Sequence, residues 1–176
     1  LRFAEKLLAT FEDDIGHLLF TCTGSEANDL ALRMAKYHTG HEGIIVTSEA
    51  YHGNSELTAG FSPSMGENSR LGAWVRRVPA PDTYRVEAGN MGDWLAAHVS
   101  EQIRDLERRG QGLAAFVADS LFTSDGIFPN DPGILEPVIA IVRAAGGVFV
   151  ADEVQCGLAR TGSRMWGYQR HRVGPR

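Results

Sequence analysis

Short apolar runs alternate with longer amphipathic stretches along most of this chain. The short runs end at turn residues and predict strands; they cover residues 17–23, 44–47, 74–78, 113–119 and 148–152. The amphipathic stretches predict helices; they cover residues 2–11, 25–37, 93–109 and 133–145, with one short helix after Asn54. This alternation favours an α/β fold, with a mostly parallel sheet, right-handed crossovers and flanking helices.

The spacing of apolar residues predicts which helix faces meet the core. Residues that recur at intervals near 3.6 should share one buried stripe. The helix at 93–109 carries such a stripe in Leu95, Val99, Ile103 and Leu106, and the opening helix carries one in Ala4, Leu7, Leu8 and Phe11. In the helix at 25–37 the same spacing picks out Leu30, Met34 and Tyr37.

The composition of the chain argues against several classes of partner. The 176 residues carry a net charge of −5 without a basic cluster, which disfavours a nucleic-acid surface. No apolar run is long enough to cross a bilayer, so we expect no membrane partner. Cys22 and Cys156 lack the spacing of a metal or redox site and indicate a reducing compartment. Because the sequence shows no signal peptide, it predicts a cytoplasmic protein.

A carboxylate ends the apolar run of the last predicted strand. The run Val148–Ala151 leads directly into Asp152. In open α/β sheets ligands gather outside the carboxyl ends of the strands, where Asp152 is expected to lie. A carboxylate there is costly unless a cation or hydrogen-bond donors meet it, and a protonated pyridine nitrogen is one such partner. The alternative is that Asp152 only caps the following turn.

A second predicted strand leads into the start of a helix. Residues 17–23 lead into Gly24 and Ser25, and the amphipathic helix at 25–37 follows. Free N–H groups and the positive end of the helix dipole make such a junction suitable for a phosphate. Gly24 allows close approach of the backbone, and the Ser25 hydroxyl can donate a hydrogen bond. The alternative is that Ser25 serves only as an N-cap.

A third predicted strand, at 44–47, is followed by Tyr51 and His52. A tyrosine ring at the carboxyl end of a strand can stack on a flat heteroaromatic ligand. His52 is a further candidate contact, although a purely structural histidine is the more common occurrence.

These segments, in this order, resemble the class III (ornithine-type) aminotransferases, which are pyridoxal 5'-phosphate (PLP) enzymes of fold type I. The matching motifs are Gly24-Ser25-Glu26-Ala27-Asn28, Tyr51-His52-Gly53 and Asp152-Glu153-Val154-Gln155, continued by similar segments at 157–162 and 166–171. The resemblance implies that residues 1–171 form part of a three-layer α/β/α large domain that binds PLP. Residues 172–176 are then a divergent or truncated end.

The resemblance also implies how the cofactor is held. Gly24 and Ser25 are expected to bind the phosphate, while Tyr51 and Val154 cover opposite faces of the ring. At the edge of the ring, Asp152 is expected to pair with the pyridine nitrogen.

Two further residues complete the expected cofactor contacts. Gln155 is expected to bond the ring hydroxyl, and His52 is counted among the residues around the cofactor. Asp119 ends the predicted strand at 113–119, so it could reach the substrate. Many members of the family carry a glutamate and a Gln-Gly-rich segment there, which the loop at 119–126 does not share.

One residue that the family requires is not found. The Schiff-base lysine of the family is expected downstream of the Asp152 motif, and the sequence reaches Arg176 without it. The only lysines are Lys6 and Lys36, and neither matches that position. Lys36 lies off the stripe expected to be buried in its helix and should point to solvent.

The function implied is that of a fragment of a PLP-dependent aminotransferase. The complete enzyme moves an amino group between an amine or amino acid and a 2-oxo acid, and acts as a homodimer. The chain itself is expected to be inactive without the lysine. Two alternatives stay open, which are a PLP-dependent phospholyase of the same family and a non-catalytic cofactor-binding or assembly fragment. No metal is expected.

Overall fold

The computed structural model describes residues 2–174 and contains one parallel sheet of four strands. The strands, in the spatial order β2-β1-β3-β4, are β2 (Val75–Val78), β1 (Gly43–Thr47), β3 (Leu113–Ala118) and β4 (Val148–Ala151). The helices are α1 (Arg2–Leu8), α2 (Gly24–Thr39), α3 (Glu56–Ala59), α4 (Met91–Arg108) and α5 (Leu135–Ala144), with short 3₁₀ turns at η1 (Pro63–Met65) and η2 (Gly167–His171). The predicted parallel sheet with flanking helices is confirmed.

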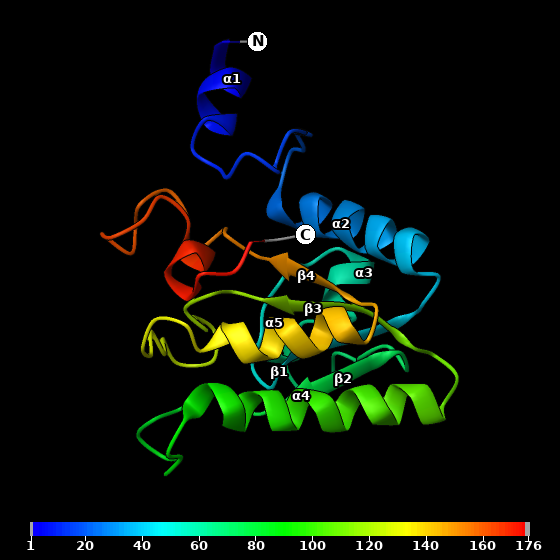
Figure 1. Ribbon diagram of the computed structural model, residues 1–176. Coiled ribbons are helices and arrows are strands. Elements are labelled where there is room, and N and C mark those ends of the chain that lie inside the picture. The colour runs from blue at the N-terminus through cyan, green and yellow to red at the C-terminus, as the bar shows by residue number, and fades with distance from the viewer. Residues whose placement is uncertain (1, 175–176) are drawn as a thin grey trace.

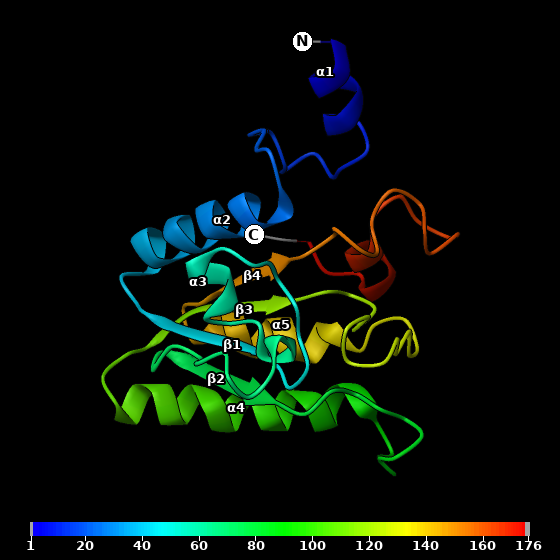
Figure 2. The ribbon, with the colours of Figure 1, turned by 180° about the vertical axis from the view of Figure 1, so that it is seen from behind.

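Helices cover both faces of the sheet (Figures 1 and 2). α4 and α5 pack against each other and against one face, while α2 packs on β3 and β4 from the other. The short helix α3 lies on the same side as α2, in front of the strands in Figure 2. This three-layer arrangement is the one that a sheet with buried strands on both faces requires.

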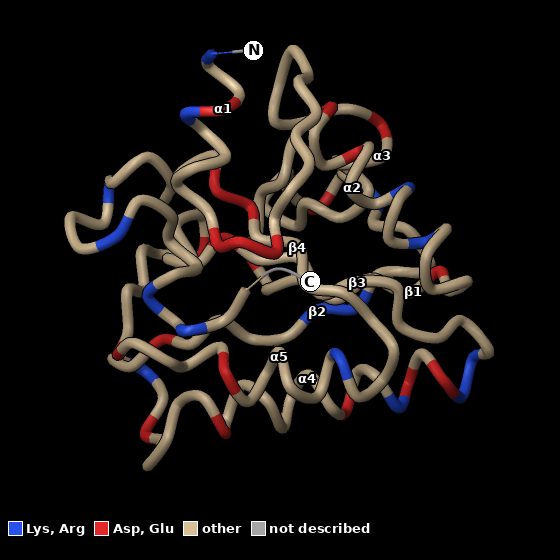
Figure 3. Tube along the Cα trace, turned by 45° about the horizontal axis from the view of Figure 1, so that its top comes forward, with Lys and Arg blue, Asp and Glu red and all other residues tan. Residues whose placement is uncertain are grey.

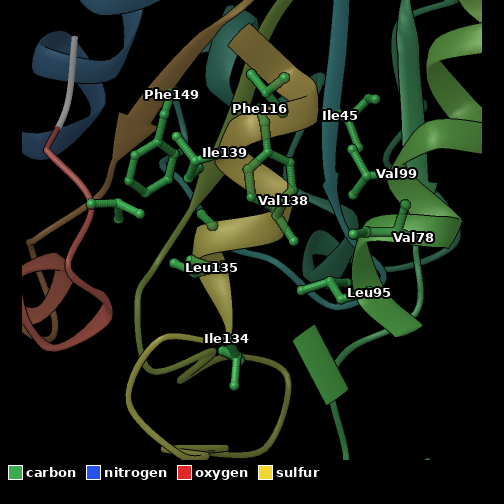
Figure 4. Close-up of a cluster of buried hydrophobic side chains, with 14 of the residues drawn as sticks. Ile45, Val78, Leu95, Val99, Phe116, Ile134, Leu135, Val138, Ile139 and Phe149 are labelled. Carbon is green, nitrogen blue, oxygen red and sulfur yellow. The ribbon is translucent and has the colours of Figure 1, made fainter. Parts of the chain in front are cut away.

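The larger part of the core lies between the sheet and the pair α4 and α5 (Figure 4). Leu95 and Val99 of α4 point toward Ile45 and Val78, and both helix residues are fully buried. Ile103 and Leu106 are buried as well, so the stripe predicted for this helix is confirmed. Phe116 of β3 lies near the centre of the same cluster.

The parallel arrangement brings the carboxyl ends of the strands to one edge of the sheet. β1 pairs with β2 on one side and with β3 on the other, and β3 pairs with β4 in register from Ala115↔Val148 to Ala118↔Ala151. The backbone N–H of Asp152 continues this ladder by donating to the Ala118 carbonyl at 2.9 Å. The segments that follow β1, β3 and β4 therefore start close together.

The strand predicted at 17–23 is wrong. Within residues 2–174 this segment pairs with no strand, and the side chains of Leu19 and Phe20 are each 64% exposed. Its composition favours a strand, but a strand forms only where a neighbour supplies hydrogen bonds and an apolar face. The segment instead reaches α2 as a loop without regular secondary structure (Figure 1).

The buried face predicted for α2 is also wrong. Met34 is 56% exposed and Tyr37 is 93% exposed, whereas Leu32 and Ala35 face the sheet. Lys36 was expected in solvent, but its ammonium lies 4.3 Å from the centre of the Trp74 ring and bonds Glu42 at 2.7 Å. Leu32 and Ala35 lie on the opposite face of the helix from Leu30, Met34 and Tyr37, so apolar spacing alone misidentifies the buried face.

The opening helix is shorter and less buried than predicted. α1 ends at Leu8 rather than at Phe11, and none of its described residues is buried. Leu7 and Phe11 are only partly buried against the core, and Phe11 stacks on Trp166 with 4.5 Å between ring centres. α1 lies apart from the layered body at the top of Figure 1.

Charged residues are distributed over the whole surface. Lys and Arg are spread along the trace in Figure 3 rather than gathered on one face. Asp105 of α4 illustrates the pattern, because it accepts from Arg76, Arg108 and Arg109. None of the helices formed by residues 2–174 combines the length and the apolar character needed to span a membrane.

Candidate functional site

A pocket of about 330 Å³ opens at the carboxyl edge of the sheet, where the ends of β1, β3 and β4 meet the start of α2. Its walls bring together residues from four separate segments: Gly24, Ser25, Tyr51, His52, Gly53, Asp119, Asp152, Val154 and Gln155. Every residue predicted to contact the cofactor or the substrate therefore lines one cavity. Its volume is at the lower end of the range typical of small-molecule sites.

Asp152 is the most completely bonded group in the pocket. Its carboxylate is 7% exposed and accepts from Asn28 Nδ2 at 2.9 Å, His52 Nδ1 at 2.8 Å and the Val154 N–H at 3.1 Å. Burial acts to raise the pKa of Asp152, but the hydrogen bonds and charge of His52, with the Asn28 and Val154 bonds, outweigh it and hold the pKa below its usual value. Asp152 is therefore a stable buried anion that faces a ligand-sized space.

His52 connects Asp152 to the core. Its side chain is 1% exposed, and its ring lies 5.7 Å from that of Phe61. Nδ1 donates to Asp152, while Nε2 is buried and has no hydrogen-bond partner within residues 2–174. A histidine with one nitrogen fixed on a carboxylate and the other in an apolar setting holds that carboxylate in a single orientation.

The start of α2 presents free backbone donors to the pocket. Thr23 caps the helix, because its hydroxyl and carbonyl oxygens accept from the N–H groups of Glu26 and Ala27. Among residues 2–174, no acceptor meets the N–H groups of Gly24 and Ser25, which lie at the positive end of a helix of 16 residues. This arrangement favours an anion such as a phosphate.

The Ser25 hydroxyl is already bonded in this arrangement. It donates to Asn54 Oδ1 at 3.2 Å and accepts from the Asn54 N–H at 3.1 Å. Any anion at this end of the pocket therefore depends first on the backbone donors of α2.

Gly53 is required by the packing of this corner. Its φ is +134°, and an added Cβ would lie 2.5 Å from Ser25 Oγ and 2.7 Å from Thr58 Oγ1. We expect Gly53→Ala to lower the free energy of unfolding. Backbone strain at this φ accounts for about 1–3 kcal/mol, and the steric overlap of the new Cβ adds to it. Urea denaturation should measure this loss. Gly16→Ala, where an added Cβ meets no atom within 4 Å, is the matched control and should be close to neutral.

Tyr51 and Val154 form the accessible part of the pocket. Tyr51 is 40% exposed and Val154 is 62% exposed. A Cβ on Gly24 would lie 2.8 Å from a methyl group of Val154, so only glycine allows this side chain to pack against the start of α2. An aromatic ring and a branched aliphatic side chain beside one cavity suit a flat, partly apolar ligand.

Asp119 lies in the pocket wall with its carboxylate already bonded. Its two oxygens accept from the N–H groups of Leu121 and Thr123 at 3.0 and 2.9 Å. This geometry makes Asp119 a turn-capping residue at the end of β3 and gives no direct support to a substrate role.

Sequence reasoning missed Asn28 and Asn54. Asn28 is 7% exposed and bonds both Asp152 and the His52 carbonyl, while Asn54 holds Ser25. The stripe predicted for α2 does not include Asn28, so its burial could not be read from the spacing of apolar residues. For Asn54 the sequence offered no signal either.

A larger cavity of about 1020 Å³ lies elsewhere, between the segments at 83–93 and 130–137. Its walls carry Glu87, Asp93, Asp131 and Glu136, and they include none of the predicted site residues. The described residues form no cluster suited to a metal ion. Volume alone does not identify a site, and the larger cavity lacks the convergent polar groups of the smaller pocket.

The lysines lie away from the pocket. Lys6 is exposed in α1, and Lys36 is held by Glu42 and Trp74. Neither is among the described residues that line the cavity.

Glu153 and His171 fasten η2 to the site. Glu153 accepts from the N–H groups of Gly167 and Tyr168 at 2.6 and 2.9 Å, and from Ser120 Oγ at 3.3 Å. His171 is fully buried and donates from Nε2 to the Ser120 carbonyl at 3.0 Å. These bonds hold the segment beside Asp152 without entering the pocket.

Acid should therefore destabilise the fold through His171. Burial lowers the pKa of His171 below 6.5, despite the opposing bond to Ser120. Because the folded state binds this proton less readily than the unfolded chain, stability is fully present above pH 6.5 and is lost as the pH falls through the folded pKa. We expect the free energy of unfolding to change with pH by at most about 1.4 kcal/mol per pH unit because of this proton. Urea denaturation at several pH values should measure this slope. His171→Gln should flatten the curve, and an unchanged slope would contradict this origin.

Comparison with known proteins agrees with the geometry. A family model described as "Aminotransferase class-III" matches residues 1–175. Alanine–glyoxylate aminotransferase 2 homolog 2 of Arabidopsis thaliana, a mitochondrial protein by name, is 37% identical over 98% of this chain and 36% of its own length. A phospholyase from Arthrobacter, solved in complex with phosphoethanolamine, has a TM-score of 0.91 and 40% identity over 99% of this chain and 42% of its own. A PLP-bound aminotransferase mutant from Vibrio fluvialis has a TM-score of 0.83 and 25% identity, over 99% and 41%.

These matches also correct one prediction. The expected cytoplasmic location is wrong as an inference from the sequence, because a relative with this degree of identity is mitochondrial by name. A small number of unpaired cysteines does not distinguish one reducing compartment from another.

The matched relatives are much longer than this chain, which spans between 36% and 42% of their length. Since the family model covers nearly every residue, the chain belongs to the class-III aminotransferase family.

Proposed function

We propose that the pocket at the carboxyl edge of the sheet binds PLP. The observation that carries this proposal is Asp152, a buried carboxylate with a lowered pKa that faces the same cavity as the start of α2. A phosphorylated pyridinium offers an anion at one end and a cation at the other. The pocket has free N–H donors at one end and a fixed carboxylate at the other, so its donor set fits the group.

The residues divide the binding between them. The N–H groups of Gly24 and Ser25 bind the phosphate, and Tyr51 and Val154 enclose the ring from the accessible side. When bound, PLP supplies an electron sink whose strength depends on a proton at the ring nitrogen.

Asp152 holds that proton at the pyridine nitrogen, and Asn28 and His52 keep its carboxylate oriented. Gln155 lies at the cavity wall, where its amide can bond the ring hydroxyl.

The activity proposed for the family site is transfer of an amino group between an amine or amino acid and a 2-oxo acid. No lysine of the chain lines the described pocket, so we assign to these residues non-covalent cofactor binding rather than the complete reaction. Residues 1–171 then correspond to part of a PLP-binding large domain, and the complete enzyme is a homodimer.

A phospholyase is the second candidate. The phospholyase from Arthrobacter shares 40% identity with the chain, compared with 25% for the Vibrio fluvialis aminotransferase. The residues that hold the cofactor cannot separate the two reactions, because both need the same protonated ring.

Stable reduced conjugates of PLP separate these two functions without requiring turnover. We expect the chain to bind N-phosphopyridoxyl-alanine more tightly than N-phosphopyridoxyl-phosphoethanolamine if the site serves amino transfer, measured by calorimetric titration. The reverse order would support phospholyase chemistry. Failure of the chain to bind either conjugate or PLP in a saturable way would contradict the proposed cofactor site.

A further inference from the structure

The loop after β3 holds the end of β1 through the partly buried carboxylate of Asp125. Asp125 Oδ2 accepts from Thr47 Oγ1 at 2.7 Å, and Oδ1 accepts from the Glu49 N–H at 2.8 Å. Thr47 is the last residue of β1, and Glu49 opens the turn that carries Tyr51 and His52. Both oxygens of Asp125 are therefore used to fix the start of that turn.

The same loop holds the segment after β4. Ser124, the neighbour of Asp125, accepts from Gln155 Nε2 at 3.2 Å. Ser124 and Asp125 are adjacent in one loop. Between them they bond the segment after β1 and the segment after β4, which form two walls of the pocket. Neither Ser124 nor Asp125 lines the cavity itself.

The loop is anchored in a conformation that does not shift freely. Phe122 is 1% exposed with a φ of +51°, and it donates to the Asp119 carbonyl at 2.9 Å. Its carbonyl accepts from the Ile127 N–H at 3.1 Å. A non-glycine residue keeps a left-handed backbone conformation only where its surroundings fix it. The buried Phe122 ring therefore fixes the conformation of the loop.

Neighbouring groups also affect the pKa of Asp125. Burial raises the pKa of Asp125, the bonds from Thr47 and Glu49 oppose that rise, and the charge of the neighbouring His52 opposes it as well. Glu49, a like charge, adds to the rise. A carboxylate retained there despite its desolvation indicates that its two bonds matter for the geometry of the turn.

We infer that Asp125 is a positioning residue for the pocket, which sets the Tyr51–His52 turn and, through Ser124, the Gln155 amide. This inference rests on the proposed cofactor site for its functional meaning. Its structural content, the dependence of the turn on Asp125, does not need the cofactor.

Two substitutions at Asp125 distinguish the loss of its hydrogen bonds from the loss of side-chain packing. Asp125→Ala removes both acceptors. Asp125→Asn keeps one oxygen for the Glu49 N–H, and its amide can donate to the Thr47 hydroxyl, so the conservative variant should restore the geometry. Asp131→Ala changes an exposed carboxylate further along the same connection and serves as the matched control.

The first measurement is hydrogen exchange of the folded chain by NMR, without ligand. We expect faster exchange of the Glu49 amide and its neighbours up to Gly53 in Asp125→Ala, normal exchange in Asp125→Asn, and unchanged exchange throughout α4 in both. Unchanged exchange at Glu49 in Asp125→Ala would overturn the inference, whatever the chain binds.

The second measurement is PLP affinity of the same variants. We expect Asp125→Ala to weaken binding by roughly tenfold, the scale of one lost hydrogen bond to a charged group, with recovery in Asp125→Asn and no change in Asp131→Ala. Wild-type affinity in Asp125→Ala would contradict the positioning role while leaving the cofactor site intact. Absence of binding by the wild-type chain would instead contradict the proposed function, and the exchange result would still decide the role of Asp125.

Discussion

Replacing Asp152 with asparagine is expected to weaken PLP binding by roughly 30- to 150-fold, which corresponds to about 2–3 kcal/mol. The carboxylate accepts three hydrogen bonds, from Asn28, His52 and the Val154 N–H, and it is the anion expected to meet the pyridine nitrogen. An amide of the same shape supplies one acceptor and turns an NH₂ group toward one set of these donors. The charge that holds the ring proton is lost as well.

Fluorescence or absorbance titration of the purified variant with PLP should measure this loss. Asp131→Asn removes an exposed carboxylate outside the pocket and is the control for net charge. Circular dichroism must show that Asp152→Asn is folded, because the buried NH₂ group of the asparagine would face hydrogen-bond donors. Near wild-type affinity in a folded Asp152→Asn would contradict the assignment of Asp152 to the ring nitrogen.

Replacing Phe116 with alanine is expected to lower the free energy of unfolding by about 3–5 kcal/mol. Phe116 is fully buried at the centre of the sheet, 6.2 Å from the ring of Phe149, and faces α4 and α5 (Figure 4). Its removal takes away apolar contacts and leaves a cavity that the surrounding elements cannot fill. A loss of that size approaches the whole free energy of unfolding of the least stable single domains, which is about 5 kcal/mol.

Urea denaturation followed by circular dichroism gives the comparison. Tyr84→Ala, at a side chain that is 90% exposed, should change the free energy of unfolding by less than about 0.5 kcal/mol. Equal stability of Phe116→Ala and the wild-type chain would show that this cluster is not the core on which the fold depends.

β1, β3 and β4 could be predicted because each is a short apolar run with turn residues at its end, while β2 carries two arginines between its apolar ends. β1 and β3 are buried along their full length, which leaves a signal that does not depend on neighbours. The segment at 17–23 carries the same signal without a partner strand among the described residues. The composition of a segment indicates how readily it forms a strand, but a strand forms only where another strand lies beside it.

The pocket could be predicted in outline because its residues follow strands in parallel order. Asp152 stands directly after an apolar run and Tyr51 follows another by four positions, and parallel strands place such positions at one edge. The supporting residues were missed because their roles depend on three-dimensional neighbours. Asn28 reaches Asp152 across 124 positions and Asp125 reaches Thr47 across 78, and no local pattern marks such pairs.

The face of α2 shows a further limit of periodicity. Leu30, Met34 and Tyr37 are larger than Ala35, yet Ala35 is buried while Met34 and Tyr37 are exposed. A small side chain lets the helix approach the sheet closely, and the spacing of large residues does not reveal this.

The location of bound PLP is the most direct test of the proposed site. Titration of ¹⁵N-labelled chain with PLP, followed by backbone amide shifts, would map it residue by residue. We predict saturable shifts at Gly24, Ser25, the turn at 51–53 and the segment at 152–155, with none around the larger cavity at 83–93 and 130–137. Shifts centred on that larger cavity, or no saturable shifts at all, would contradict a PLP site at the carboxyl edge of the sheet.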